Sequence, residues 1–161
     1  MSSDLQLFHA FTKQFSNQEI KGVHSIGRNY FLVNDDVWEL REKIMRDPFA
    51  TGIFLGEAQK HFMPSPAAVD IVSRFEDADR KKIFINPKAE WLFLCGRSVL
   101  ETSIVRNPNQ LKEGLVLVQN AHNENLGYGI FKQEGKDLVI KRLVDKGMYL
   151  RSEERKRPKK E

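Results

Sequence analysis

The chain has 161 residues, with 26 basic and 22 acidic side chains and a formal charge of +4. Its length fits one ordinary domain or two small ones, and a 40% share of hydrophobic residues can form compact cores. Cys95 is the only cysteine, which excludes an intrachain disulfide framework and a cysteine-based zinc knuckle and favours a reducing, intracellular setting. We expect neither a signal peptide nor a membrane segment, because no apolar run approaches the roughly 20 residues that cross a bilayer.

The first predicted element is a helix with an aromatic stripe. Ser3 and Gln6 have the spacing of a capping box, which satisfies the free N–H groups at a helix start. Phe8, Phe11 and Phe15 then fall at i, i+3 and i+7, so they share one face of the helix. We expect this helix to end near residue 16 and to bury that face.

Two hairpins and two further helices are predicted next. The expected strands are residues 23–26, 30–33, 52–55 and 61–63. Gly56 is expected to form the turn of the second hairpin. Residues 37–45 fit either a helix or a strand end followed by a shorter helix, and both alternatives stay open. Pro66 is predicted to be the first residue of a helix that runs to about Phe75. The first half is therefore an α+β unit, an antiparallel sheet with flanking helices.

The next segment predicts a small, partly closed barrel with one plug helix. Asn86 caps this helix, and Gly96 supplies its left-handed stop. The residues between them are apolar on nearly every face, so Trp91 and Cys95 are expected to pack in the core. Base stacking by Trp91 and a nucleophilic role of Cys95 are the alternatives. The predicted strands of the barrel are residues 83–85, 99–100, 104–105, 114–118, 127–131, 138–140 and 148–150.

Positive charge is concentrated at the end of the chain. Residues 1–79 hold 8 basic and 12 acidic side chains, whereas residues 80–154 hold 13 and 9. The tail, residues 155–161, has five basic residues and one acidic residue. We therefore predict an N-terminal domain to residue 79, a basic domain to residue 154 and a basic tail. A nucleic-acid partner fits this asymmetry, and a merely solvated tail is the alternative.

Several short motifs follow one another through the predicted barrel. They are Ile83-x-x-x-Pro87-x-Ala89-Glu90, Gly96-x-x-Val99-Leu100, Gly114 before a valine-rich strand, Leu126-Gly-Tyr-Gly129 and Gly147-x-Tyr-Leu-Arg151. In this order they resemble the PUA domain, the RNA-binding module named after pseudouridine synthases and archaeosine transglycosylases. The resemblance implies that RNA lies in a groove formed by the first helix of the domain, the loop and strand after it, and the final strand.

The first half narrows the resemblance. Glu42-Lys-Ile-Met45, the hairpin 52–63 and the ending Tyr149–Glu154 are similar to the Nip-seven family of large-ribosomal-subunit biogenesis factors in eukaryotes and archaea. The basic tail departs from eukaryotic members and points to the archaeal type. The resemblance implies a monomeric, non-catalytic factor that binds pre-rRNA and meets other assembly proteins through its N-terminal domain. It is expected to be cytoplasmic, or nucleolar or nuclear if eukaryotic.

The resemblance also implies particular RNA-binding residues. Mapped by motif, the groove holds Lys88, Arg97, Ser98 and Arg151. The tail would add the cations Arg155, Lys156, Arg157, Lys159 and Lys160. The two groove arginines can each offer a fork of N–H groups to phosphate oxygens, and the serine hydroxyl can donate or accept a hydrogen bond. A solvated arginine at position 97 and a turn-forming serine at position 98 are the alternatives.

No catalytic, metal or cofactor site is expected. His9, His24 and His61 lack the HxxxH or HxH spacing of metal ligands, and the chain has no P-loop. Gly127 and Gly129 precede no predicted helix, so they make a poor dinucleotide-binding motif. Two other functions stay open. One is a protein–protein adaptor that uses the acidic first half, and the other is an RNA-modifying enzyme or its accessory subunit.

Overall fold

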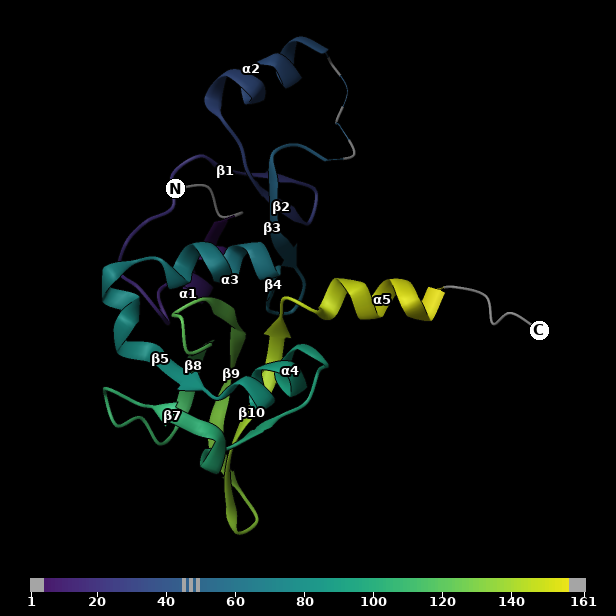
Figure 1. Cartoon of the computed structure of the whole chain (residues 1–161). Coiled ribbons are helices and arrows are strands. Elements are labelled where there is room, and N and C mark those ends of the chain that lie inside the picture. Colours follow the sequence, from purple (N-terminus) through teal and green to yellow (C-terminus); the bar gives the residue numbers. More distant parts are fainter. Residues whose placement is uncertain (1–4, 45, 47, 49, 157–161) are drawn as a thin grey trace, which may run out of the picture. The chain divides into compact units, whose positions relative to one another are not determined.

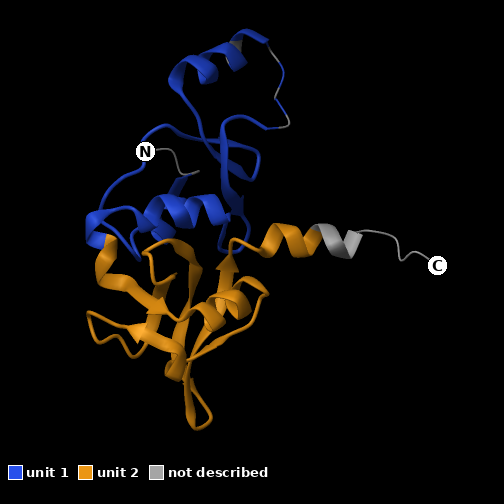
Figure 2. Ribbon diagram, viewed as in Figure 1, with its two compact units in different colours: residues 1–77 blue, residues 78–161 orange. Residues whose placement is uncertain are grey.

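The computed structural model of the chain describes residues 5–44, 46, 48 and 50–156. The chain divides into two compact units, Met1–Asp77 and Ala78–Glu161 (Figure 2). The division falls two residues before the predicted boundary at residue 79, within the short 3-10 helix η2 (Glu76–Lys81). Within the described residues, no helix is long and apolar enough to cross a membrane.

The first unit is a four-stranded antiparallel sheet with three helices (Figure 1). Its strands, in the order in which they pair, are β1 (Val23–Ile26), β2 (Asn29–Leu32), β3 (Ile53–Ala58) and β4 (Phe62–Pro64). Its helices are α1 (Gln6–Thr12), α2 (Asp35–Ile44) and α3 (Pro66–Ser73). The predicted burial of Phe8, Phe11 and Phe15 is confirmed, but the predicted helix end near residue 16 is wrong, because α1 ends at Thr12 and Phe15 lies in the turn after it. The rings of Phe8 and Phe11 lie 5.3 and 5.4 Å from the ring of Phe62.

Local sequence signals explain most of this unit. Pro66 is the first residue of α3, as predicted, and the Ser65 side chain accepts a hydrogen bond from the Ala68 N–H at 3.1 Å. The helical alternative for residues 37–45 is right, although α2 begins earlier, at Asp35. Acidic residues in that first turn favour a helix start because their negative charge is attracted to the positive end of the helix dipole. The predicted capping box at Ser3 lies outside the described residues.

The second hairpin forms, but the predicted turn at Gly56 is wrong. Gly56 lies inside β3, opposite Pro64, and the chain turns later, where the Gln59 N–H donates to the His61 carbonyl at 3.0 Å. A Cβ at Gly56 would collide with the Met63 carbonyl, and its φ of +145° also favours glycine. This glycine therefore permits a close approach of two strands and does not form the turn.

The second unit contains a six-stranded sheet that curls into a nearly closed barrel. Its strands, in pairing order, are β6 (Val99–Leu100), β10 (Asp137–Asp145), β9 (Asn125–Glu134), β8 (Gly114–Gln119), β5 (Lys82–Ile85) and β7 (Ile104–Arg106). The two edge strands, β6 and β7, are separated in the chain only by η3 (Glu101–Ser103). Six flat strands would span about 24 Å at roughly 4.8 Å per spacing. A three-residue connection reaches only about 14 Å, so the edges must approach each other. The predicted partly closed barrel is confirmed.

Helix α4 (Pro87–Leu94) covers the barrel core with one face. The Asn86 side chain caps it by accepting a hydrogen bond from the Ala89 N–H at 2.9 Å, and Gly96 follows it at φ +87°, as predicted. Ala89 and Phe93 are buried and pack with the strands. The core residues from the strands are Ile83, Ile85, Val99, Val116, Val118, Leu126, Phe131 and Ile140.

The prediction that Trp91 and Cys95 pack in the core is wrong. Trp91 is 66% exposed and Cys95 is also exposed. The two residues are four apart, so they share a helix face that points away from Ala89 and Phe93. Apolar composition on every side of α4 therefore does not mean burial on every side, because the barrel covers only one face.

The predicted final strand, residues 148–150, is also wrong, because these residues begin helix α5 (Met148–Lys156). At the start of α5 the Asp145 carboxylate accepts the Gly147 N–H at 2.8 Å. The residues that follow, Arg151-Ser-Glu-Glu-Arg-Lys156, include five strong helix formers and no β-branched residue. The high helix propensity of residues 151–156 therefore extends to residues 148–150 and makes them helical.

Candidate nucleic-acid interface

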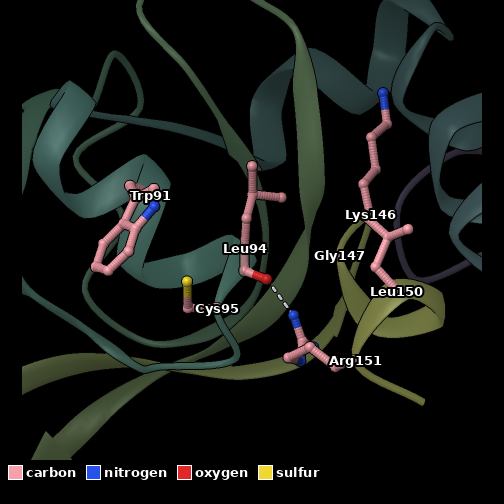
Figure 3. Close-up of a pocket in the computed structure, with 7 residues that line it drawn as sticks. All are labelled: Trp91, Leu94, Cys95, Lys146, Gly147, Leu150 and Arg151. Atoms are coloured by element: carbon pink, nitrogen blue, oxygen red, sulfur yellow. Dashed lines mark hydrogen bonds between the residues drawn. The ribbon is translucent and has the colours of Figure 1, made fainter. Parts of the chain in front are cut away.

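A cavity of about 560 Å³ opens between α4 and α5 in the second unit (Figure 3). Its lining residues are Trp91, Leu94 and Cys95 from the end of α4, Lys146 and Gly147 from the turn after β10, and Leu150 and Arg151 from the start of α5. Trp91 and Leu150 are 66% and 69% exposed. A cavity with apolar walls and a few polar groups is the usual form of a ligand site. Trp91 offers a flat ring and Lys146 a cation at its border.

A buried carboxylate holds one wall of this cavity. Asp145, at the end of β10, is 0% exposed and accepts hydrogen bonds from two arginines. Arg151 donates to both of its oxygens, at 2.9 and 2.6 Å, and Arg142 donates to Oδ2 at 3.1 Å. The hydrogen bond with Asp145 raises the pKa of Arg151. The buried negative charge is therefore paired and hydrogen-bonded, as a charge in the interior must be.

The same two arginines connect the end of α4 to β10 and α5. Arg151 also donates to the Leu94 carbonyl at the end of α4 (Figure 3). Arg142 donates through Nε to the Gly96 carbonyl at 3.2 Å. A Cβ at Gly96 would lie 3.2 Å from Nε of Arg151, so a larger residue would press on this contact as well as strain the left-handed backbone. The network thus sets the position of the loop that follows α4.

Three of the predicted groove residues are exposed. Lys88 lies in the first turn of α4, and Arg97 and Ser98 lie between Gly96 and β6. Within the described part of the chain, none of these three side chains has a hydrogen bond or an ion pair. Their donors are open to a ligand, which is the condition for contact with phosphate.

Arg151 has different surroundings from those that the resemblance implied. It lies beside Gly96, as the motif mapping predicted, but its two terminal nitrogens already contact Asp145 and Leu94. Its side chain is only 26% exposed. The geometry assigns it first to holding the wall of the cavity.

The predicted tail cations are only partly described. Arg155 and Lys156 belong to the last turn of α5, but their side chains lie outside the description. Arg157, Lys159 and Lys160 lie outside the described residues. Their place in the proposed site therefore rests on the sequence.

Sequence reasoning assigned Trp91 to the core and missed Asp145, Arg142 and Lys146. Helical periodicity could have predicted the exposure of Trp91, because Trp91 and Phe93 lie on opposite faces of α4. Asp145 gave no such signal, since its role depends on the helix that replaces the predicted last strand. Among the described residues, no group of three His, Cys, Asp or Glu side chains could hold a metal ion.

Comparison with known proteins identifies the class of this unit. Residues 81–154 match the family model described as the UPF0113 PUA domain. The predicted PUA resemblance is thus confirmed for this segment, whereas membership of the Nip-seven family stays a prediction.

Two archaeal relatives are both called UPF0113 protein. The one from Archaeoglobus fulgidus is 27% identical over 113 residues, which cover 65% of this chain and 63% of the relative. The one from Aeropyrum pernix is 30% identical over 117 residues, which cover 71% of this chain and 65% of the relative. The chain therefore spans less than two thirds of the length of either protein.

Two solved structures are also similar. A conserved PUA domain protein from Thermoplasma acidophilum is 15% identical with a TM-score of 0.46, over 62% of this chain and 69% of that chain. A hypothetical protein from Pyrococcus horikoshii is 20% identical with a TM-score of 0.41, over 70% of this chain and 85% of that chain.

Proposed function

We propose that the protein is a non-catalytic RNA-binding factor of large-ribosomal-subunit biogenesis, of the kind formed by the Nip-seven family. The observation that carries this proposal is the match of residues 81–154 to a PUA domain, because such domains usually bind RNA. Pre-rRNA is the proposed ligand. The protein acts as a monomer, and other assembly proteins bind through the first unit.

The cavity between α4 and α5 supports RNA binding in a particular way. Trp91 presents an exposed ring on which an unpaired base can stack, an interaction worth about 1–3 kcal/mol per base. Lys88 and Arg97 contact phosphate oxygens near it, and Ser98 adds a hydrogen bond. Arg151 holds the wall through its hydrogen bonds to Asp145.

We propose no catalytic step. The lining residues of the cavity include no carboxylate and no histidine, so they offer no acid and base pair for proton transfer. Cys95 lies at the border of the cavity, where the lining residues include no histidine to activate it. The site is suited to binding an unpaired base and its phosphates.

Replacement of the exposed tryptophan tests the proposed function. Trp91→Ala should weaken binding of a single-stranded RNA by about 5- to 100-fold, because it removes the stacking surface. Fluorescence anisotropy with a labelled oligonucleotide measures the change. Trp38→Ala is the matched control, since Trp38 stacks on His24 in the first unit at 4.0 Å, and it should leave the affinity unchanged. Equal affinities of wild-type and Trp91→Ala protein would contradict the proposal.

One observation favours the protein–protein adaptor as a second function. Val37, Leu40 and Ile44 lie on one face of α2 and are 47%, 53% and 58% exposed. The helix is held at Trp38, whose ring stacks on His24 and lies 4.5 Å from the Arg41 guanidinium. An exposed apolar stripe is typical of a helix that docks on a partner. The acidic first half of the chain favours a basic partner.

A further inference from the structure

A second cavity, of about 290 Å³, lies in the second unit beside the edge strand β7. Its lining residues are Asp79, Lys82, Phe84, Arg106, Pro108, Asn109 and Asn123. None of them lines the cavity between α4 and α5. They come from η2, from strands β5 and β7, from the loop after β7 and from the loop between β8 and β9. The proposed function gives this cavity no role.

Arg106 is held in place by an aromatic ring. It pairs directly with Phe84 across β5 and β7, and its Cζ lies 3.6 Å from the centre of the Phe84 ring. Phe84 is 5% exposed, so the ring is fixed in the sheet. Within the described residues the guanidinium has neither a carboxylate partner nor a hydrogen bond. Stacking of this kind fixes the plane of the guanidinium and leaves its N–H edges open to a ligand.

Asn123 is presented to the same cavity by a rigid loop. The buried Asn120 organises this loop, because its side-chain oxygen accepts the backbone N–H groups of His122 and Glu124 at 2.9 and 3.0 Å. The Asn123 N–H donates to the Asn120 carbonyl at 3.1 Å, and Asn123 has a φ of +63°. Its own carboxamide has no partner among the described residues. The Asn123 carboxamide therefore borders the cavity as a donor that a ligand can contact.

The charge of the cavity favours an anion. Nζ of Lys82 lies 2.6 Å from the Asp79 carboxylate, so the one acidic lining residue is already paired. Arg106 is the remaining charged group, and the lining residues together carry a net charge of +1. Pre-positioned donors around an unpaired guanidinium are the usual surroundings of a phosphate group.

We propose that this second cavity binds a phosphate group. Arg106 donates two N–H groups to two of its oxygens, and the Asn123 carboxamide donates to one of the same two oxygens. A tetrahedral phosphate offers oxygens in several directions, whereas a planar carboxylate is satisfied by the arginine fork alone. Under the proposed function, on which this assignment of the source rests, the group is a phosphodiester of the bound RNA. The cavity then gives the RNA a second contact, separate from Trp91.

Titration with inorganic phosphate tests the site without RNA. In ¹H–¹⁵N spectra of the full chain, the Arg106 Nε–H and the Asn123 carboxamide signals should shift together and saturate. Arg106→Gln should abolish saturation, and Asn123→Gly should weaken it while keeping a residue that accepts a positive φ. Arg28→Gln is the matched control, because it removes an exposed arginine of the first unit that lies outside the cavity. Unsaturable shifts, or shifts that persist in Arg106→Gln, would overturn the site.

Binding of a single-stranded RNA identifies the source of the phosphate. Arg106→Gln should lower RNA affinity about tenfold and reduce the slope of log affinity against log salt by about 0.7. If phosphate saturates the site but Arg106→Gln leaves RNA affinity unchanged, the RNA source is wrong and a free phosphate compound is the ligand. If wild-type protein binds phosphate but no RNA, the proposed function fails and the phosphate site stands.

Discussion

At the scale of single residues, the second unit depends on one carboxylate that the sequence does not single out. Asp145 joins the last strand to α5 through Gly147 and accepts hydrogen bonds from two arginines. A buried charge is costly, and it becomes still more costly when its partners are lost. Because those arginines also hold Leu94 and Gly96, we expect the loop after α4 and the first turn of α5 to respond together when Asp145 changes.

We predict that Asp145→Asn will destabilise the protein by about 2–3 kcal/mol. The amide keeps the volume but removes the charge that both arginines contact, and charge-assisted hydrogen bonds of this kind contribute roughly 1.5–3 kcal/mol. Urea unfolding measures the change. Glu134→Gln is the control, because Glu134 and Lys132 form an exposed pair at 3.6 Å that should contribute less than about 0.5 kcal/mol. Equal effects of the two substitutions would show that Asp145 does not have this structural role.

At the scale of elements, α4 and α2 both expose apolar side chains that could contact a ligand or a partner. Each helix has apolar residues on a face that its own unit leaves uncovered. On α4 that face carries Trp91 beside a cavity with cations near it, which fits a nucleobase. On α2 it carries an aliphatic stripe centred on Leu40, which fits the apolar face of another protein. Burial, and not apolar composition, separates the structural face of a helix from its binding face.

The stripe on α2 gives a prediction about stability. Leu40→Gln should change the free energy of unfolding by less than about 0.5 kcal/mol, because the side chain is already half exposed. Leu55→Gln, at a fully buried leucine in β3 of the same unit, should cost about 3 kcal/mol or more. Urea denaturation of both variants checks this. A large cost for Leu40→Gln would mean that the stripe is covered within the protein, which would remove the surface on which the adaptor function rests.

At the scale of the whole molecule, prediction succeeded where local signals decide the structure. The cap at Asn86, the helix start at Pro66 and the burial of the stripe that begins at Phe8 each depend on a few neighbouring residues, and the structure has all three. The turn at Gly56 was wrong because this glycine is required by the close approach of β4, which sequence patterns do not distinguish from a turn. The face of α4 was wrong because only the barrel determines which side of the helix is covered.

The candidate site was less predictable than the fold for the same reason. Arg97 and Ser98 could be located from the Gly96 motif, because their positions follow from the end of α4. The place of Arg151 was predictable, but its partners were not, since they depend on the buried Asp145 and on α5 replacing a strand. Motifs therefore indicated which segments meet, and tertiary contacts determined which donors remain open to a ligand.

The charge distribution of the whole chain gives the last prediction. Because Arg151 is already paired within the protein, we expect the five cations of residues 155–161 to make most of the remaining phosphate contacts. At roughly −0.7 per contact on single-stranded RNA, they can contribute at most about −3.5 to the slope of log affinity against log salt. We expect about −2 to −3, because not every cation contacts a phosphate at one time. Deletion of residues 155–161 should remove that contribution and weaken binding to two unrelated RNAs equally, whereas Arg97→Ala should change the preference between them. Salt titrations of both proteins decide the matter: an unchanged slope after deletion, or a loss for only one RNA, would show that the tail is not a general phosphate contact.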